Sequence, residues 1–132
     1  MAKILVVDDT QGIRNMLQKA LVGWGHEVTV LEDGGEAIRF LAATKVDLLI
    51  TDMYMPEVDG VELIRRLRGS GTVGRIVAMS GGGSVSSETT LALAGALGAD
   101  EELAKPFSLT RLKEIVDGLI ADLASEVSAG ES

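Results

Sequence analysis

The stretch from Ile4 to Asp9 reads ILVVDD and decides the fold. Four branched apolar residues are followed at once by two adjacent carboxylates. An apolar run without polar alternation predicts a strand that is covered on both faces, as in a parallel sheet. Functional groups in open α/β sheets gather beyond the carboxyl ends of the strands. Asp8 and Asp9 are therefore the first candidate site residues, and polar groups after later strands are expected to join them.

The composition indicates one globular domain. The chain has 132 residues, of which 46% are hydrophobic and only 3% aromatic, so aliphatic side chains must fill the core. The absence of cysteine excludes disulfides, thiol catalysis and thiolate metal sites, and it suits a cytoplasmic protein. A net charge of -8 disfavours nucleic-acid binding and suits a basic partner or a divalent cation. We expect no membrane contact, because no apolar run approaches the ~20 residues that span a bilayer and the N-terminus lacks a signal-peptide pattern.

Short apolar runs alternate with segments of helical spacing along the rest of the chain. Further strands are predicted at Val28–Leu31, Leu48–Thr51, Ile76–Met79 and, from position rather than composition, Glu101–Ala104. Five β-α repeats predict a doubly wound parallel sheet in an α/β fold, with helices on both faces. Residues 1–123 are expected to form this domain, and residues 124–132 a flexible C-terminal tail or linker stub.

Helix boundaries carry local signals. Capping patterns are predicted at Asp33 with Glu36, at Asp59 with Glu62, and at Ser108. Glycines at 23, 25, 69 and 71 mark helix ends. A helix at Val85–Ala96 is also predicted, although it lacks a clear apolar stripe.

Polar residues follow the third, fourth and fifth predicted strands as well. They are Asp52, Ser80 and Lys105. Carboxylates gathered about 4 Å apart repel by roughly 1–4 kcal/mol per pair, so a counter-charge is required. A hard divalent cation such as Mg²⁺ prefers oxygen ligands, and Lys105 adds an ammonium group. An ionised carboxylate beside these charges is a usable nucleophile toward phosphorus.

The whole pattern resembles the receiver domain of bacterial two-component response regulators, the superfamily of the chemotaxis regulator. The matching pieces are VVDD, TDMYMPEVDG, an apolar run ending in MSGG, and GADEELAKPF, in that order. The resemblance implies a flavodoxin-like (βα)5 receiver fold with strand order 2-1-3-4-5. It also implies a phosphorelay role, with a sensor histidine kinase or a histidine phosphotransfer protein as donor. The output would pass to a downstream target protein or to an effector domain outside this chain.

The resemblance further implies a role for each site residue. Asp52 would be the phosphoacceptor. Asp9, Asp52 and the backbone carbonyl of Tyr54 would bind Mg²⁺ or Mn²⁺ directly, and Asp8 would act through metal-bound water. Lys105 would pair with Asp52 before phosphorylation and with the phosphoryl group afterwards.

Ser80 would reorient to donate a hydrogen bond to a phosphoryl oxygen, by the same resemblance. Pro106 resembles the residue that follows a cis Lys-Pro bond in this family. Like other receivers, the protein would catalyse only its own phosphorylation and dephosphorylation, so we do not expect a conventional enzyme.

Two positions depart from the family pattern. Glu102 occupies a place where many receivers have an aromatic residue that turns inward, and a carboxylate cannot refill an apolar slot without a partner. The run Gly81-Gly82-Gly83 follows Ser80, where the family needs one small residue. We therefore expect switching to depend on this loop and on the helix after it.

Two other classes of protein share part of this pattern. A haloacid-dehalogenase-type phosphohydrolase also uses Asp, Ser or Thr, Lys and Mg²⁺, but it needs two acids spaced two apart, and Thr10 stands at the second of those places. A receiver-like interaction scaffold that is never phosphorylated would not need the complete set of acids.

Overall fold

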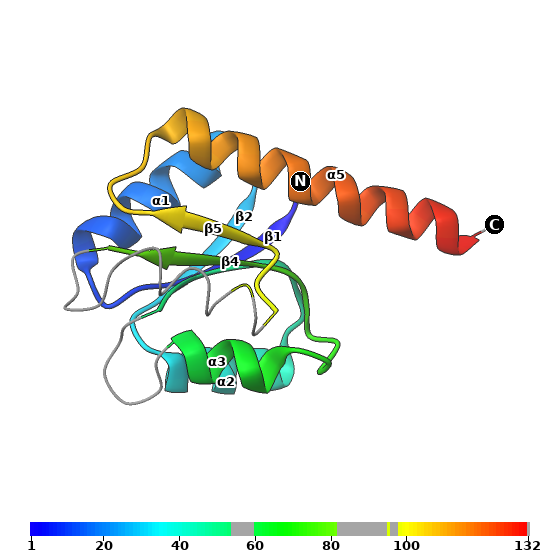
Figure 1. The fold of residues 1–132 in the computed structure, drawn as a ribbon, viewed down its shortest axis with the longest axis horizontal. Coiled ribbons are helices and arrows are strands. Elements are labelled where there is room, and N and C mark those ends of the chain that lie inside the picture. Colours follow the sequence, from blue (N-terminus) through cyan, green and yellow to red (C-terminus); the bar gives the residue numbers. More distant parts are fainter. Residues whose placement is uncertain (54–59, 82–94, 96–97, 132) are drawn as a thin grey trace.

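The computed structural model describes residues 1–53, 60–81, 95 and 98–131 (Figure 1). The strands are β1 (Lys3–Val7), β2 (Glu27–Leu31), β3 (Val46–Asp52), β4 (Val73–Ser80) and β5 (Glu101–Ala104). The helices are α1 (Gln11–Gly23), α2 (Gly34–Ala43), α3 (Gly60–Leu67) and α5 (Leu109–Glu131). Most of the helix predicted at Val85–Ala96 lies outside the described residues, as does Asp59 of one capping pattern.

The five strands form one parallel sheet in the order β2-β1-β3-β4-β5. This confirms the doubly wound topology and the order expected from the resemblance. Strand β1 pairs with β2 on one side and with β3 on the other, so the strand order reverses at β1. Figure 1 shows α1 and α5 on one face of the sheet and α2 and α3 on the opposite face.

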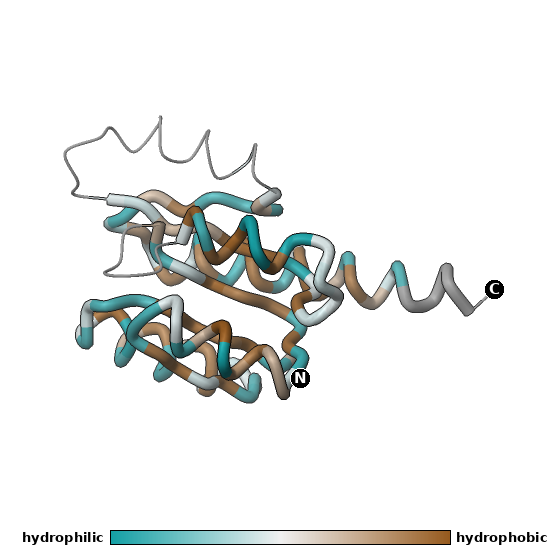
Figure 2. The backbone as a smooth tube through the Cα atoms, turned by 90° about the horizontal axis from the view of Figure 1, so that it is seen from below, coloured by the Kyte–Doolittle hydropathy of each residue, from teal (hydrophilic) through white to brown (hydrophobic). Residues whose placement is uncertain are grey.

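Alternation along β1 supplies both faces of the sheet. Ile4 and Val6 belong to the core beneath α1 and α5, whereas Leu5 and Val7 belong to the core beneath α2 and α3. All four side chains are fully buried. Figure 2 shows the hydrophobic colour concentrated along the strands between the two helical layers. An uninterrupted apolar run is therefore what a strand needs when helices cover both of its faces.

Most helix boundaries follow the local signals in the sequence. The Asp33 side chain accepts a hydrogen bond from the Glu36 backbone N–H at 2.8 Å and caps α2. Ser108 accepts one from the Arg111 N–H at 3.0 Å before α5. Beyond the end of α1, Gly25 has a φ of 96°, a conformation that side chains rarely adopt.

The weakly marked strand β5 is confirmed at Glu101–Ala104. Only Leu103 in this strand is buried, which explains why its composition carried little signal. Asp100, just before it, accepts hydrogen bonds from the Ile76 N–H at 2.8 Å and from Arg68 at 3.2 Å. The Asp100 side chain thus accepts a hydrogen bond from a backbone N–H of β4 that lies just before the pairing with β5 begins.

Helix α5 continues to Glu131, into the segment expected to be a flexible tail. Glu126 forms an ion pair with Arg75 of β4, and this contact raises the pKa of the Arg75 guanidinium. The end of the helix projects beyond the sheet in both views (Figures 1 and 2). No helix in the described part of the chain is long and apolar enough to cross a membrane.

Candidate functional site

The predicted site residues meet at the carboxyl edge of the sheet. Asp8 and Asp9 directly follow β1, Asp52 ends β3, Ser80 ends β4 and Lys105 directly follows β5. The strand register explains this convergence, because Asp52 lies opposite Met79 and Ser80 lies opposite Ala104. Residues that are far apart in sequence therefore reach one place, as the positions after each strand predicted.

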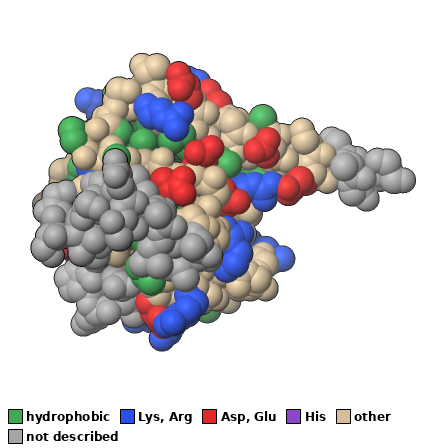
Figure 3. All heavy atoms as spheres, viewed as in Figure 1, with side chains coloured by type: hydrophobic (Ala, Val, Ile, Leu, Met, Phe, Trp, Pro, Cys, Tyr) green, Lys and Arg blue, Asp and Glu red, His purple; other side chains and the backbone are tan. Residues whose placement is uncertain are grey.

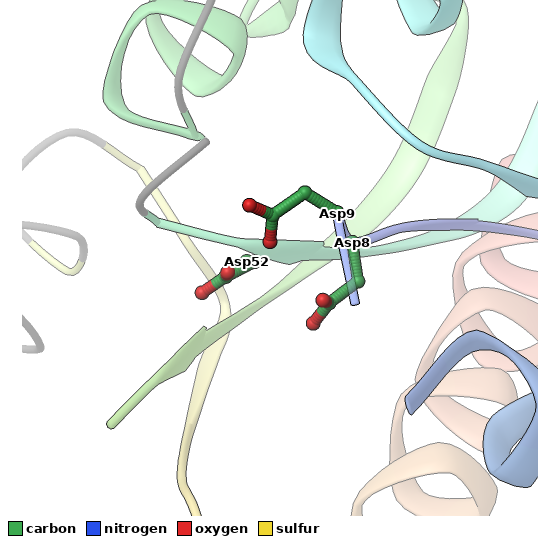
Figure 4. Close-up of side chains that lie close together, drawn as sticks. All are labelled: Asp8, Asp9 and Asp52. Carbon is green, nitrogen blue, oxygen red and sulfur yellow. The ribbon is translucent and has the colours of Figure 1, made fainter. Parts of the chain in front are cut away.

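Three carboxylates form the centre of the site (Figure 4). One oxygen from each of Asp8, Asp9 and Asp52 can be chosen so that all three lie within 4.8 Å of one another. Asp8 is fully buried, Asp52 is 8% exposed and Asp9 is exposed. A donor set made only of carboxylate oxygens, open to solvent on the Asp9 side, fits a hard divalent cation such as Mg²⁺.

Lys105 supplies the positive charge of the site. Its Nζ atom lies 2.8 Å from Asp8 Oδ2 and 3.7 Å from Asp52 Oδ2. The resemblance implied Asp52 as its partner before phosphorylation, so the shorter contact to Asp8 refines that expectation. Asp8 has no exposed surface through which water could solvate its charge. The ammonium group of Lys105 therefore stabilises the charge of Asp8 more than that of the slightly exposed Asp52.

The backbone around Lys105 is held by its neighbours. Its N–H donates to the Ser80 carbonyl oxygen at 2.6 Å, and the Lys105-Pro106 peptide bond is cis. A Cβ atom on Gly81 would lie 2.7 Å from Lys105 Cβ, so only glycine fits between β4 and the lysine without a shift. The Ser80 side chain is 1% exposed at the end of its strand.

The sequence did not reveal several residues that hold the aspartates in place. Asp8 accepts a hydrogen bond from the Thr10 N–H at 2.8 Å through Oδ1, and its backbone carbonyl accepts one from Arg14 Nη1 at 2.8 Å. The buried hydroxyl of Thr51 donates to the Asp52 carbonyl oxygen at 3.0 Å. Only the position of Arg14 one turn into the helix that follows Asp9 could have suggested its role.

Gly60 is a further supporting residue that the sequence did not single out. A Cβ atom there would lie 2.2 Å from the Asp52 carbonyl oxygen and 2.7 Å from Met53 Cα. The first turn of α3 therefore packs directly against the backbone of Asp52. Such a contact between separate elements leaves no local pattern in the sequence.

The remaining predicted residues are Tyr54, Gly82 and Glu102. Tyr54 and Gly82 are outside the described residues. Glu102 is partly buried in β5, and a Cβ atom on Gly95 would lie 2.7 Å from its Oε1 atom. Its carboxylate thus lies against the backbone of Gly95.

Comparison with known proteins identifies the family. A model of the response regulator receiver domain matches residues 4–117. The chain belongs to this family. Receiver domains are components of two-component signalling, so membership supports a signalling role rather than that of a conventional enzyme.

Curated relatives of this receiver are longer than the chain. It is 36% identical over 130 residues to the response regulator MprA of Mycolicibacterium vanbaalenii, covering 98% of this chain and 55% of that protein. It is 40% identical over 110 residues to MprA of Mycobacterium tuberculosis, covering 83% of this chain and 46% of that protein. The receiver thus spans about half the length of the curated relatives that it matches.

Solved structures agree with the fold. The crystal structure of a response regulator receiver domain protein from Clostridium thermocellum superposes with a TM-score of 0.84 at 28% identity. The match covers 94% of this chain and 98% of that one. The sheet order and the helical layers are therefore those of a receiver domain.

Proposed function

We propose that this receiver accepts a phosphoryl group on Asp52 from a histidine kinase or a histidine phosphotransfer protein and then changes its affinity for a partner. The observation that carries the proposal is the placing of three carboxylates within 4.8 Å of one another beside the Lys105 ammonium group. A cytoplasmic location follows from the role, because the donor phosphohistidine domains of such systems face the cytoplasm.

The chain offers suitable ligands for Mg²⁺ or Mn²⁺. Asp9 and Asp52 would be the direct carboxylate ligands, and the carbonyl of Tyr54, outside the described residues, would be the third. Asp8 already accepts hydrogen bonds through both of its oxygens, from Thr10 and from Lys105, which supports an indirect role through metal-bound water. When bound, the cation would supply positive charge to balance the carboxylates and the phosphoryl oxygens.

The protein side chains prepare Asp52 as the nucleophile. A carboxylate oxygen of Asp52 forms a bond to phosphorus while the phosphorus–nitrogen bond of the donor phosphohistidine breaks. The electron pair of that bond stays on the imidazole, which takes up a proton. Lys105 lies close enough to Asp52 to stabilise charge on the transferred group, and Ser80 has a hydroxyl at the end of the next strand.

The backbone of Asp52 is fixed from two sides, by the Thr51 hydroxyl and by the close approach of Gly60. A fixed backbone limits the positions that the attacking carboxylate can take when the phosphoryl donor arrives, and this favours transfer. Gly81 leaves the space next to Lys105 without a side chain. The switch residues Glu102, Gly81, Gly82 and Pro106 remain predictions within this proposal.

The test is labelling with acetyl phosphate, followed by mass spectrometry of the intact protein. We expect one phosphoryl group on the wild type with Mg²⁺, and none with EDTA or on the Asp52→Asn variant. Asp47→Asn is the matched control, because Asp47 lies on the same strand at the opposite edge of the sheet and should label normally.

Two results would contradict the proposal. Absence of labelling in the wild type would favour an interaction scaffold that never takes phosphate. Steady hydrolysis of a phosphate ester that depends on Asp8 and survives in Asp52→Asn would favour a dehalogenase-type phosphohydrolase.

A further inference from the structure

The two adjacent aspartates after β1 are held very differently. The Asp8 N–H donates to the Leu31 carbonyl oxygen at 3.2 Å, and the Asp8 carboxylate oxygens accept from Thr10 and Lys105. The Asp9 side chain is exposed, and it has no hydrogen-bond partner within the part of the chain that the structure describes. Figure 4 shows the two side chains leaving the end of β1 in different directions. The direction of the Asp9 carboxylate is therefore set by its backbone.

One peptide group links the two aspartates. The carbonyl of Asp8 and the N–H of Asp9 belong to the same plane, so a contact that holds the carbonyl oxygen also fixes the plane from which Asp9 begins. Arg14 makes this contact, because its Nη1 atom donates to the Asp8 carbonyl oxygen at 2.8 Å. The backbone N–H of Arg14 donates to the Thr10 carbonyl oxygen at 3.1 Å at the start of α1. The Arg14 side chain thus reaches back from the helix to the end of β1.

The guanidinium group of Arg14 contacts a neutral oxygen rather than a carboxylate. Among the described residues it forms no ion pair, although it lies beside the end of a strand that carries two acids of the cluster. Two effects on a cation at this cluster are therefore opposed. The positive charge of Arg14 repels the cation. The hydrogen bond keeps Asp9 where one of its oxygens lies within 4.8 Å of oxygens of Asp8 and Asp52.

The positioning effect is expected to be the larger of the two. Solvent on the exposed Asp9 side and dissolved salt both reduce the repulsion between Arg14 and a cation. Loss of a residue that orients a metal ligand, by contrast, typically lowers metal affinity by roughly 10- to 100-fold.

We propose that Arg14 is a positioning residue that sets the affinity of the acidic cluster for Mg²⁺ by holding the peptide group between Asp8 and Asp9. The proposal rests on the proposed function only in taking Mg²⁺ as the cation of the cluster. It predicts a change of definite sign. Loss of the Arg14 side chain weakens Mg²⁺ binding, whereas an effect of charge alone would strengthen it.

Charges on the outer surface provide the control for this sign. In the view of Figure 3, acidic and basic side chains lie interspersed, so each charge is partly balanced by its neighbours. Salt screens what remains beyond about 10 Å. Lys19 is an exposed residue of the same helix. Lys19→Met removes one positive charge from α1, as Arg14→Met does, without removing a donor to the Asp8 carbonyl oxygen.

The first experiment is titration of metal-free protein with Mg²⁺ by isothermal calorimetry at neutral pH. We expect the dissociation constant to rise roughly tenfold in Arg14→Met. It should stay within about twofold of the wild type in Lys19→Met. Unchanged or tighter binding in Arg14→Met overturns the proposal. A wild type that takes up no Mg²⁺ overturns it together with the metal-dependent step of the proposed function.

Arg14→Lys separates charge from geometry, and it serves as the test if Arg14→Met does not fold. Lysine keeps the charge on a shorter stem and lacks the planar fork of donors. Its dissociation constant should therefore lie between those of the wild type and Arg14→Met. A value equal to that of the wild type would assign the effect to charge and overturn the proposal.

Labelling by acetyl phosphate distinguishes metal affinity from a direct effect on the phosphoryl group. Arg14→Met should label slowly at low Mg²⁺ and at nearly the wild-type rate once Mg²⁺ is saturating, because only the affinity has changed. Labelling that remains slow at saturating Mg²⁺ would place the role of Arg14 at the phosphoryl group and contradict the proposal. If the wild type binds Mg²⁺ but is not labelled, the proposed function fails while the role of Arg14 in metal binding stands.

Nuclear magnetic resonance of the metal-free protein in EDTA tests the contact itself. The Asp9 amide shares its peptide group with the carbonyl that Arg14 holds. Its nitrogen resonance should therefore shift in Arg14→Met and stay in place in Lys19→Met. An Asp9 resonance that is the same in both variants would show that Arg14 does not hold this peptide group in solution, and the proposal would fail.

Discussion

Two lysine–aspartate ion pairs of nearly equal length lie in contrasting parts of the receiver. At the carboxyl edge of the sheet, Lys105 and Asp8 approach to 2.8 Å, with side chains that are 19% and 0% exposed. On the outer surface of α5, Lys113 and Asp117 approach to 2.6 Å, with side chains that are 48% and 52% exposed. Water solvates the second pair whether or not it forms, but it cannot solvate Asp8. Burial, rather than the distance between the charged atoms, therefore decides how strongly the loss of one partner of an ion pair changes the free energy of unfolding.

The largest expected effect follows from removing each lysine. Lys105→Met leaves three clustered carboxylates without their ammonium group, so it should lower the free energy of unfolding by about 3 kcal/mol in EDTA. Lys113→Met should change it by no more than about 0.5 kcal/mol. Urea denaturation of both variants measures the difference. Equal losses would show that burial is not what separates the two pairs.

Two glycines extend the same comparison from charge to packing. Gly60 at the site is crowded by the backbone of Asp52, whereas a Cβ atom on Gly118 in α5 would meet nothing within 4 Å. Gly60→Ala should therefore lower the free energy of unfolding by about 2 kcal/mol through overpacking, and it should slow labelling by acetyl phosphate. Gly118→Ala should stabilise the protein by about 0.5–1 kcal/mol, because alanine is the better helix former.

These opposite signs are checked by thermal denaturation of both variants at the same protein concentration. The labelling rate adds a second readout, and it should be unchanged in Gly118→Ala. Tolerance of alanine at position 60 would mean that α3 can move away from Asp52 at little cost.

The smallest change in stability is expected at His26. This side chain is partly buried, so its exposure lies between that of the buried Asp8 and that of the exposed Lys113–Asp117 pair. Its Nδ1 atom accepts a hydrogen bond from the Ala2 N–H at 3.1 Å, which requires the neutral ring. Burial lowers the pKa of His26 below 6.5, the positive N-terminus and Lys113 lower it further, and Asp117 opposes them. The unfolded chain therefore binds more protons just below pH 6.5, and stability should fall as the pH drops from 6.5 toward the folded pKa.

Urea denaturation between about pH 5 and pH 7 measures this slope. His26→Gln keeps a side-chain acceptor without a titrating group, so the slope in that window should decrease. An unchanged slope would assign the pH dependence to the carboxylates instead.

Much of the fold could be predicted because its signals are local. The run Ile4–Val7 is apolar at every position since helices cover both sides of β1. The site could be predicted because each parallel strand delivers the residue after it to one edge, which brought Asp8, Asp52 and Lys105 together. The short strand β5 carried almost no compositional signal, and only its place in the alternation identified it.

Other features could not be predicted because they arise from contacts between separate elements, which leave no local pattern in the sequence. The small size of Gly60 is explained only by the backbone of Asp52 beside it. The extension of α5 through residues 124–131 was missed because its small and polar residues resemble a tail, and one anchoring contact comes from Arg75 on β4.

The sequence by itself determined the order of elements, the parallel sheet and which polar residues meet at its carboxyl edge, because periodicity and the residue after each strand are properties of the chain. Only the tertiary structure decided that Lys105 lies closer to Asp8 than to Asp52, and that Asp8 is fully buried while Asp9 beside it is exposed. The physical reason is that burial belongs to the packed molecule. Substitution of a lysine or a glycine is therefore expected to change the stability strongly at one position and hardly at all at another.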